Sequence, residues 1–137
     1  MKIDEQTLIQ AALRARENAY APYSGFRVGA ALLAQDGTVY TGCNVECASF
    51  SVTNCAERTA LFKAVSEGER HFTALAVVGG KDDTPQAEIT PCGVCRQALY
   101  EFCGGDLIVL MAQDEAHFTR CTLAELLPAG FGPKELV

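Results

Sequence analysis

Two nearly continuous apolar runs, residues 72–79 (FTALAVVG) and 107–112 (LIVLMA), constrain the fold of this chain most strongly. Runs of this length and character are typical of strands that are buried on both faces of a sheet. Between them, Thr90 and Pro91 form a favourable helix start, and the glycines at 104–105 end that helix about three turns later. Because a helix lies between the two runs, we expect them to pair in parallel through a right-handed crossover.

Local patterns on either side of this unit predict further helices and strands. These elements are a helix over 4–19 capped by Asp4, strands over 27–34 and 38–45 joined at Asp36 and Gly37, a helix over 53–67 capped by Thr53 or Asn54, an edge strand over 118–121, and a short helix opened by the capping box of Thr122 and Glu125. On the first of these helices, Arg14, Arg16 and Glu17 should face outward.

The alternation of helices and strands predicts an α/β fold. At 137 residues the chain has about the length of one ordinary domain. We therefore expect a single domain over residues 1–137, built as three layers. Its centre would be a mixed, mostly parallel five-stranded sheet with helices on both faces.

The charge balance restricts the class of partner. The chain has 11 Lys and Arg residues against 17 Asp and Glu residues, a formal charge of −6. Nucleic-acid binding rests largely on basic side chains that neutralise phosphates, so a small molecule is the better expectation and neither nucleic acid nor membrane is an expected partner. No apolar run approaches the roughly 20 residues that span a bilayer, and the first ten residues lack the pattern of a signal peptide. We expect a cytoplasmic protein.

Seven cysteines are an odd number and a high one for a cytoplasmic chain, which indicates metal binding or catalysis rather than disulfides. Cys92 and Cys95 share one helix face, and Cys55 opens the other predicted helix. Helix N-termini lower thiol pKa values and so supply the thiolates that zinc requires. Three protein ligands leave a fourth position for water, as in a catalytic zinc site.

Two neighbours of Cys55 fit such a site. Glu57 is a carboxylate suited to moving protons beside the metal, and Arg58 is placed to offset the net negative charge of three thiolates and one Zn²⁺. The alternative is a structural zinc site closed by a fourth thiol such as Cys43 or Cys47, in which Glu57 and Arg58 would have no evident purpose.

The segments 54–60 (NCAERTA) and 90–97 (TPCGVCRQ) resemble the small, homotetrameric type of cytidine deaminase. Four other segments agree with the resemblance, which covers nearly the whole chain. These are 21–26, 28–32, 42–46 and 126–131. The resemblance implies a cytidine deaminase-like fold and a hydrolase of pyrimidine salvage, which converts cytidine and deoxycytidine to uridine and deoxyuridine with release of ammonia.

The resemblance also implies roles for individual residues. Cys55, Cys92 and Cys95 would bind one Zn²⁺ per subunit, and Glu57 would carry the proton from water to the pyrimidine. The residues implied for substrate binding are Asn44 and Glu46 on the ribose, Phe26 on the pyrimidine, the backbone around Ala56, Thr90 and Pro91 at the base and its amino group, and Phe131, which would reach a neighbouring active site in a homotetramer.

Two positions depart from the family pattern. Cys47 stands where many relatives have Asn, and Phe50 stands where many have Tyr, so hydrogen bonds from those side chains are missing here. Two other functions stay open from the sequence. One is deamination of a nucleoside-like antibiotic or of cytosine in nucleic acid, and the other is a zinc-stabilised scaffold without turnover.

Overall fold

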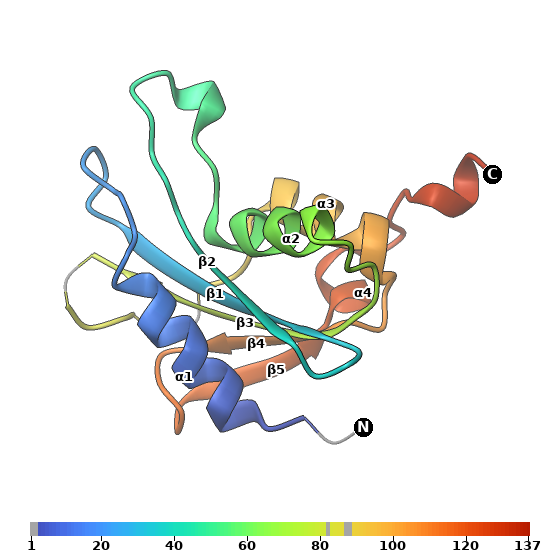
Figure 1. Ribbon diagram of the computed structural model, residues 1–137, viewed down its shortest axis with the longest axis horizontal. Coiled ribbons are helices and arrows are strands. Elements are labelled where there is room, and N and C mark those ends of the chain that lie inside the picture. The colour runs from blue at the N-terminus through green and yellow to red at the C-terminus, as the bar shows by residue number, and fades with distance from the viewer. Residues whose placement is uncertain (1–2, 82, 87–88) are drawn as a thin grey trace.

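The computed structural model describes residues 3–81, 83–86 and 89–137. At its centre lies one sheet of five strands in the order β2-β1-β3-β4-β5 (Figure 1). The strands are β1 (Arg27–Ala34), β2 (Val39–Cys43), β3 (Phe72–Gly80), β4 (Ile108–Ala112) and β5 (Phe118–Thr122). The α-helices are α1 (Glu5–Arg16), α2 (Ala56–Ser66), α3 (Gly93–Cys103) and α4 (Leu123–Leu126), with short 3-10 turns at Phe50–Val52 and Pro133–Glu135.

The sheet is mixed, as predicted, and its two central apolar strands β3 and β4 are parallel. The prediction of a mostly parallel sheet is wrong, because the pairs β1–β2, β1–β3 and β4–β5 are antiparallel. Two of these pairs are hairpins, which are antiparallel by construction. The third pair, β1–β3, follows from the strand order. Since β1 lies between β2 and β3, the connection through α2 crosses over β1, and β3 runs parallel to β2 and antiparallel to β1.

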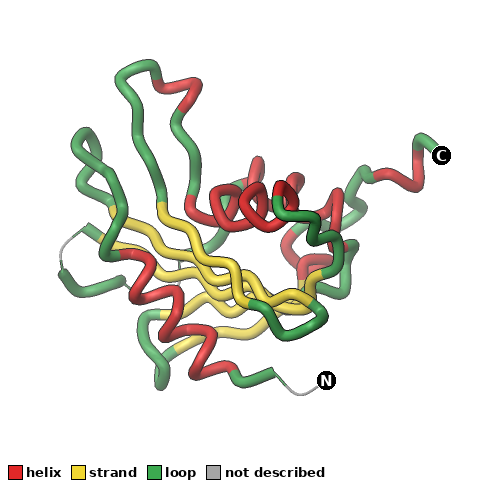
Figure 2. Tube along the Cα trace, viewed as in Figure 1, coloured by secondary structure: helices red, strands yellow, loops and turns green. Residues whose placement is uncertain are grey.

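Helices cover both faces of the sheet, which confirms the three-layer prediction (Figure 2). On one face, α1 packs Leu8, Ile9 and Ala12 against the sheet. On the other face, α2 and α3 bring Leu61 and Leu99 into a second buried cluster with β1, β3 and β4. Among the described residues, no helix has both the length and the apolar character needed to cross a bilayer.

Helix α1 begins where the sequence predicts. The Asp4 carboxylate accepts a hydrogen bond from the backbone N–H of Thr7 at 3.1 Å. The prediction that Arg16 faces outward is wrong, because its side chain is only 5% exposed. The Arg16 guanidinium donates to the carbonyls of Arg27, Gly80 and Asp83. It thereby links the end of α1 to β1, to β3 and to the loop after β3.

Helices α2 and α3 both begin later than predicted. Their N-cap residues are Cys55 and Cys92, in place of Thr53 or Asn54 and of Thr90. Neither cysteine makes a side-chain capping hydrogen bond. Both thiols therefore lie at helix N-termini without a hydrogen bond to their own helix, and they remain available to each other.

A close approach of backbones brings α2 onto the sheet. A Cβ atom on Gly42 of β2 would lie 2.5 Å from the Ala60 nitrogen and 2.6 Å from the Ala56 oxygen. No larger residue fits there without moving the helix. Gly42 thereby sets the position of the first turn of α2, which carries Glu57.

Candidate active site

Three thiols from two helices converge. The Sγ atom of Cys92 lies 3.7 Å from that of Cys55 and 3.5 Å from that of Cys95. All three sulfurs lie within 4.8 Å of one another, and in the part of the chain that the structure describes they form the one cluster of His, Cys, Asp and Glu side chains with this spacing. Cys95 is buried, whereas Cys92 is exposed and faces the pocket.

The cluster fits a zinc ion. Two sulfurs that each lie about 2.3 Å from a tetrahedral Zn²⁺ are about 3.8 Å apart, close to the distances between these thiols. Hydrogen bonding with Cys95, supported by Arg58, lowers the pKa of Cys55 to about 5. The same pairing and burial raise the pKa of Cys95.

Arg58 lies against the cluster, as the sequence predicts. One terminal nitrogen of its guanidinium donates to Cys55 Sγ at 3.5 Å. The Nε atom is buried and has no hydrogen-bond partner among the described residues. A guanidinium held against sulfur in this way offsets the charge of a three-thiolate donor set.

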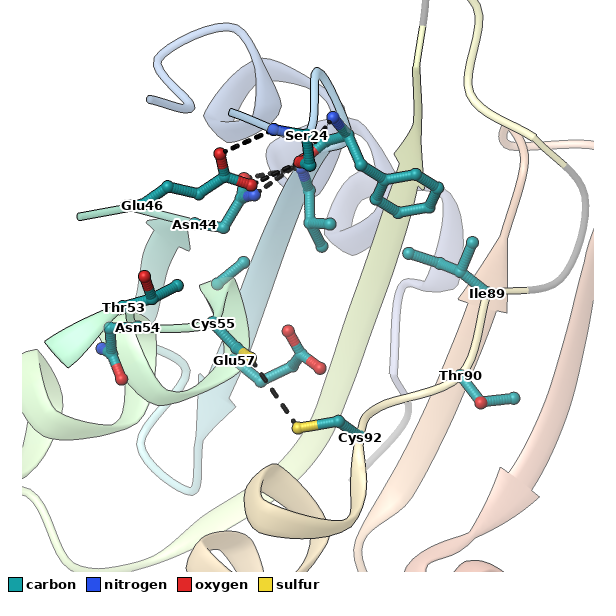
Figure 3. A pocket seen from close by; sticks show the side chains of 13 residues that line it. Ser24, Asn44, Glu46, Thr53, Asn54, Cys55, Glu57, Ile89, Thr90 and Cys92 are labelled. Carbon is teal, nitrogen blue, oxygen red and sulfur yellow. Dashed lines mark hydrogen bonds between the residues drawn. The ribbon is translucent and has the colours of Figure 1, made fainter. Parts of the chain in front are cut away.

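Glu57 lies on the first turn of α2, and its carboxylate points into the pocket beside Cys55 and Cys92 (Figure 3). The residue is only 4% exposed. Burial raises the pKa of Glu57 from 4.5 to about 7, and the negative charge of Cys55 adds to the rise. A carboxyl group with a pKa near neutrality can both accept and release a proton at physiological pH.

The cluster and Glu57 lie at one end of a pocket of about 350 Å³. At the other end are Ser24, Asn44 and Glu46 (Figure 3). The Asn44 amide oxygen accepts from the backbone N–H of Val28 at 2.8 Å, and its nitrogen donates to the carbonyl of Phe26 at 2.7 Å. The pocket therefore has a polar end that can bind a ligand and an acid–base end that can transform it.

An apolar wall joins the two ends. A Cβ atom on Gly79 would lie 2.5 Å from Ile89 Cδ1, 3.1 Å from Val28 Cγ2 and 3.2 Å from Phe26 Cε1. The absence of a side chain at Gly79 lets these three side chains meet over β3. A flat, apolar ring would pack against this wall.

Comparisons with known proteins agree with this geometry. The family model for the cytidine and deoxycytidylate deaminase zinc-binding region matches residues 2–111. The chain belongs to the cytidine and deoxycytidylate deaminase family. It is 52% identical over 134 residues to a cytidine deaminase of Sporosarcina psychrophila, covering 98% of this chain and 96% of the relative. A crystal structure of cytidine deaminase from Burkholderia pseudomallei, 46% identical, has a TM-score of 0.86 and covers 94% of this chain and 100% of that one.

The structure of this family member brings together most of the residues that the sequence singled out. The pocket is lined by Phe26, Asn44, Glu46, Cys55, Ala56, Glu57, Thr90 and Cys92, and Cys95 lies buried beneath them. Phe131 is not among the lining residues of this pocket. Its side chain is 58% exposed, and its carbonyl accepts a hydrogen bond from Gln97 at 2.7 Å.

Cys47 is not part of the three-thiol cluster of this deaminase-family chain. Its thiol lies 3.9 Å from the carbonyl of Val52, in a neighbouring hollow with Phe50. A zinc site closed by Cys47 therefore has no support among the described residues.

Sequence reasoning singled out neither Ser24 nor the apolar pair Val28 and Ile89 as site residues. Ser24 is an exposed residue in a turn, and the other two are apolar side chains with no chemistry of their own. The one available signal is the position of each residue within or beside a segment that resembles the family.

Proposed function

We propose that this chain catalyses the hydrolytic deamination of cytidine and deoxycytidine. Water replaces the amino group on ring carbon 4, so the products are uridine or deoxyuridine and ammonia. The observation that carries the proposal is the position of Glu57, a buried carboxyl group with a pKa of about 7 beside three clustered thiols in a ligand-sized pocket. The names of the relatives from Sporosarcina psychrophila and Burkholderia pseudomallei support it.

Cys55, Cys92 and Cys95 would hold the metal, one Zn²⁺ per subunit. When bound, zinc supplies a Lewis acid that makes water more acidic at neutral pH. Three thiolates weaken that effect because they leave the donor set with a net charge of −1. Arg58 donates to Cys55 Sγ and withdraws part of this charge.

Glu57 would carry the protons of the reaction. It would take a proton from the attacking water, deliver it to ring nitrogen 3, and help to protonate the departing amino group. These steps need a group that both gains and loses a proton, and in the metal-free protein the pKa of the Glu57 carboxyl group is raised toward neutrality. Burial is the main cause of this raised pKa, and it arises because the first turn of α2 packs against the sheet.

The opposite end of the pocket would select a nucleoside. Asn44 and Glu46 would hydrogen-bond the sugar hydroxyls, Phe26 would pack on the pyrimidine, and the backbone at Ala56 would contact the base. The residues that line the pocket include neither Lys nor Arg, and they do include the carboxylate of Glu46. Within one subunit, the described residues would offer no cation to a 5′-phosphate there, which favours a nucleoside over a nucleotide and over nucleic acid.

The functional unit would be a cytoplasmic homotetramer that serves pyrimidine salvage. Phe131 supports this proposal, because its side chain is 58% exposed while Gln97 holds its backbone on α3. Phe50 and Val52 are also exposed, at 77% and 63%, on the loop between β2 and α2. Such side chains are suited to burial against another subunit. Light scattering after size-exclusion chromatography tests this, and a stable, active monomer would contradict it.

The activity is tested by ultraviolet-monitored conversion of cytidine, with zinc quantified in the same samples. We expect uridine and ammonia in equal amounts from the wild type and one zinc per chain. A Glu57→Ala variant should keep its zinc and lose most of its turnover. Zinc-loaded wild type that leaves cytidine and deoxycytidine unchanged would contradict the proposal and would favour a nucleoside analogue as substrate or a scaffold role.

A further inference from the structure

The hydroxyl of Ser24 joins two residues that line the pocket. Ser24 lies in the turn between α1 and β1. Its oxygen accepts a hydrogen bond from the backbone N–H of Phe26 at 2.9 Å, and its proton is donated to a carboxylate oxygen of Glu46. A serine hydroxyl has one donor, so this arrangement commits the donor to Glu46.

The same turn holds the other carboxylate oxygen of Glu46. The backbone N–H groups of Tyr23 and Ser24 both donate to it, at 3.0 and 3.1 Å. A carboxylate offers about four acceptor positions, and the turn occupies three of them. Glu46 is thus held by three donors. The carboxylate oxygen that accepts from the Ser24 hydroxyl keeps acceptor capacity.

The backbone of Phe26 is held from both sides. Its N–H donates to Ser24, and its carbonyl accepts from the Asn44 amide at 2.7 Å. The segment that carries Asn44 and Glu46 is also tied to the turn. The N–H of Glu46 donates to the carbonyl of Tyr20 at 2.9 Å, and the N–H of Tyr20 donates to the carbonyl of Asn44 at 3.0 Å.

We propose that Ser24 is a positioning residue for nucleoside binding, which acts by holding the Glu46 carboxylate in one fixed arrangement before the ligand enters. This proposal rests on the proposed function. A free glutamate side chain loses rotamer freedom when a ligand orders it, and that loss weakens binding. Glu46 held by Ser24 has already lost this freedom, so Ser24 should lower KM more than it raises kcat.

The test compares Ser24→Ala with Ser24→Thr, which keeps the hydroxyl, and with Ser66→Ala as the matched control. Ser66 Oγ donates to the carbonyl of Lys63 at the far end of α2, so Ser66→Ala removes one hydroxyl hydrogen bond away from the pocket. We expect Ser24→Ala to raise KM for cytidine by about fivefold, which corresponds to the cost of ordering one glutamate side chain on binding. Its kcat should change by less than about threefold, and Ser24→Thr and Ser66→Ala should resemble the wild type.

A double-mutant cycle separates positioning from direct contact with the ligand. If Ser24 acts through Glu46, then Ser24→Ala should change kcat/KM by less than about twofold in a Glu46→Ala background, measured in single turnovers with enzyme in excess. If Ser24 binds the sugar itself, the two substitutions together should lower kcat/KM by the product of their separate effects. That result would contradict the positioning role. A Ser24→Thr variant with a KM as high as that of Ser24→Ala would also overturn it, because the hydroxyl would then not be the cause.

The activity of the wild type and that of the Ser24→Ala variant separate the role of Ser24 from the deaminase function. An inactive wild type with zinc bound contradicts both. An active wild type whose Ser24→Ala variant behaves like Ser66→Ala contradicts the role of Ser24 alone. A fall in kcat at unchanged KM contradicts it as well, because Ser24 would then act on the chemical step.

Discussion

Cys55 and Cys92 are the N-cap residues of α2 and α3, and their sulfur atoms lie 3.7 Å apart. The positive ends of two helix dipoles therefore meet at the thiols. A serine or aspartate at an N-cap normally bonds its own helix. These cysteines make no such bond, and their thiols contact each other instead.

Removal of one thiol should abolish zinc binding. We expect Cys95→Ala to bind far less than one zinc per chain, since two thiolates and water bind the ion much more weakly than three thiolates. Elemental analysis after dialysis against a mild chelator measures this. Cys121→Ala, which changes a cysteine of β5 outside the cluster, should keep one zinc per chain, and equal zinc contents in the two variants would contradict the ligand assignment.

Conversion of Glu57 to its amide should affect the chemistry and not the metal. Glu57→Gln keeps the shape of the side chain and removes its acid–base function, so kcat/KM for cytidine should fall by about 10²–10⁴-fold with zinc retained. Glu67→Gln, at the end of α2, is the matched control. A Glu57→Gln variant with more than a tenth of wild-type activity would show that another group moves the proton.

The same substitution should stabilise the metal-free protein at alkaline pH. The folded state raises the pKa of Glu57 from 4.5 to about 7, so folding disfavours its ionised form by about 3 kcal/mol. This cost is absent below pH 4.5, grows as pH rises, and is complete above about pH 7. Urea denaturation with chelator and reductant should therefore find Glu57→Gln and wild type similar at pH 4.5 and the variant more stable at pH 8. A difference that shrinks as pH rises would contradict the raised pKa.

Arg58 should strengthen metal binding without being a ligand. Its guanidinium donates to Cys55 Sγ at 3.5 Å, and loss of such a partner typically weakens metal affinity by about 10–100-fold. Competition with a chromophoric chelator should show this loss for Arg58→Ala. Arg70→Ala, beyond the other end of α2, should bind zinc as the wild type does.

Arg16 should contribute to stability although it lies outside the site. Arg16→Met keeps most of the aliphatic length but leaves the carbonyls of Arg27, Gly80 and Asp83 without this donor. We expect a loss of about 2–4 kcal/mol in the free energy of unfolding. Arg14→Met, on the exposed side of the same helix, should change it by less than about 0.5 kcal/mol. Equal effects of the two changes would contradict the burial of Arg16.

Much of the fold could be predicted where a signal acts over a few residues. Asp4 caps α1, and the box of Thr122 and Glu125 opens α4, because each side chain bonds a backbone group three residues away. The hairpin at Gly37 follows from a left-handed backbone conformation, with φ of 94°, that glycine adopts readily. The pair Cys92 and Cys95 follows from the spacing of one helical turn.

Other features depend on parts of the chain that meet only in the folded protein. The bond between Ser24 and Glu46 spans 22 positions, and the bond that buries Arg16 against Gly80 spans 64. The antiparallel pairing of β1 with β3 likewise joins strands that no local pattern relates. The start of α2 at Cys55 also depends on a distant contact, because Asn54, the residue before Cys55, pairs with Val45 in an isolated β-bridge.

The amino-acid sequence alone specified the chemistry, in the form of three thiols, one carboxyl group and one guanidinium at the starts of two predicted helices. Tertiary structure decided whether that chemistry can work. It placed Cys55 within 3.7 Å of Cys92 and buried Glu57, which brings its pKa to about 7. Residue types and short-range spacing are local properties that periodicity records. The distance between two helix starts and the exclusion of water arise only when distant segments pack together, so no local pattern contains them.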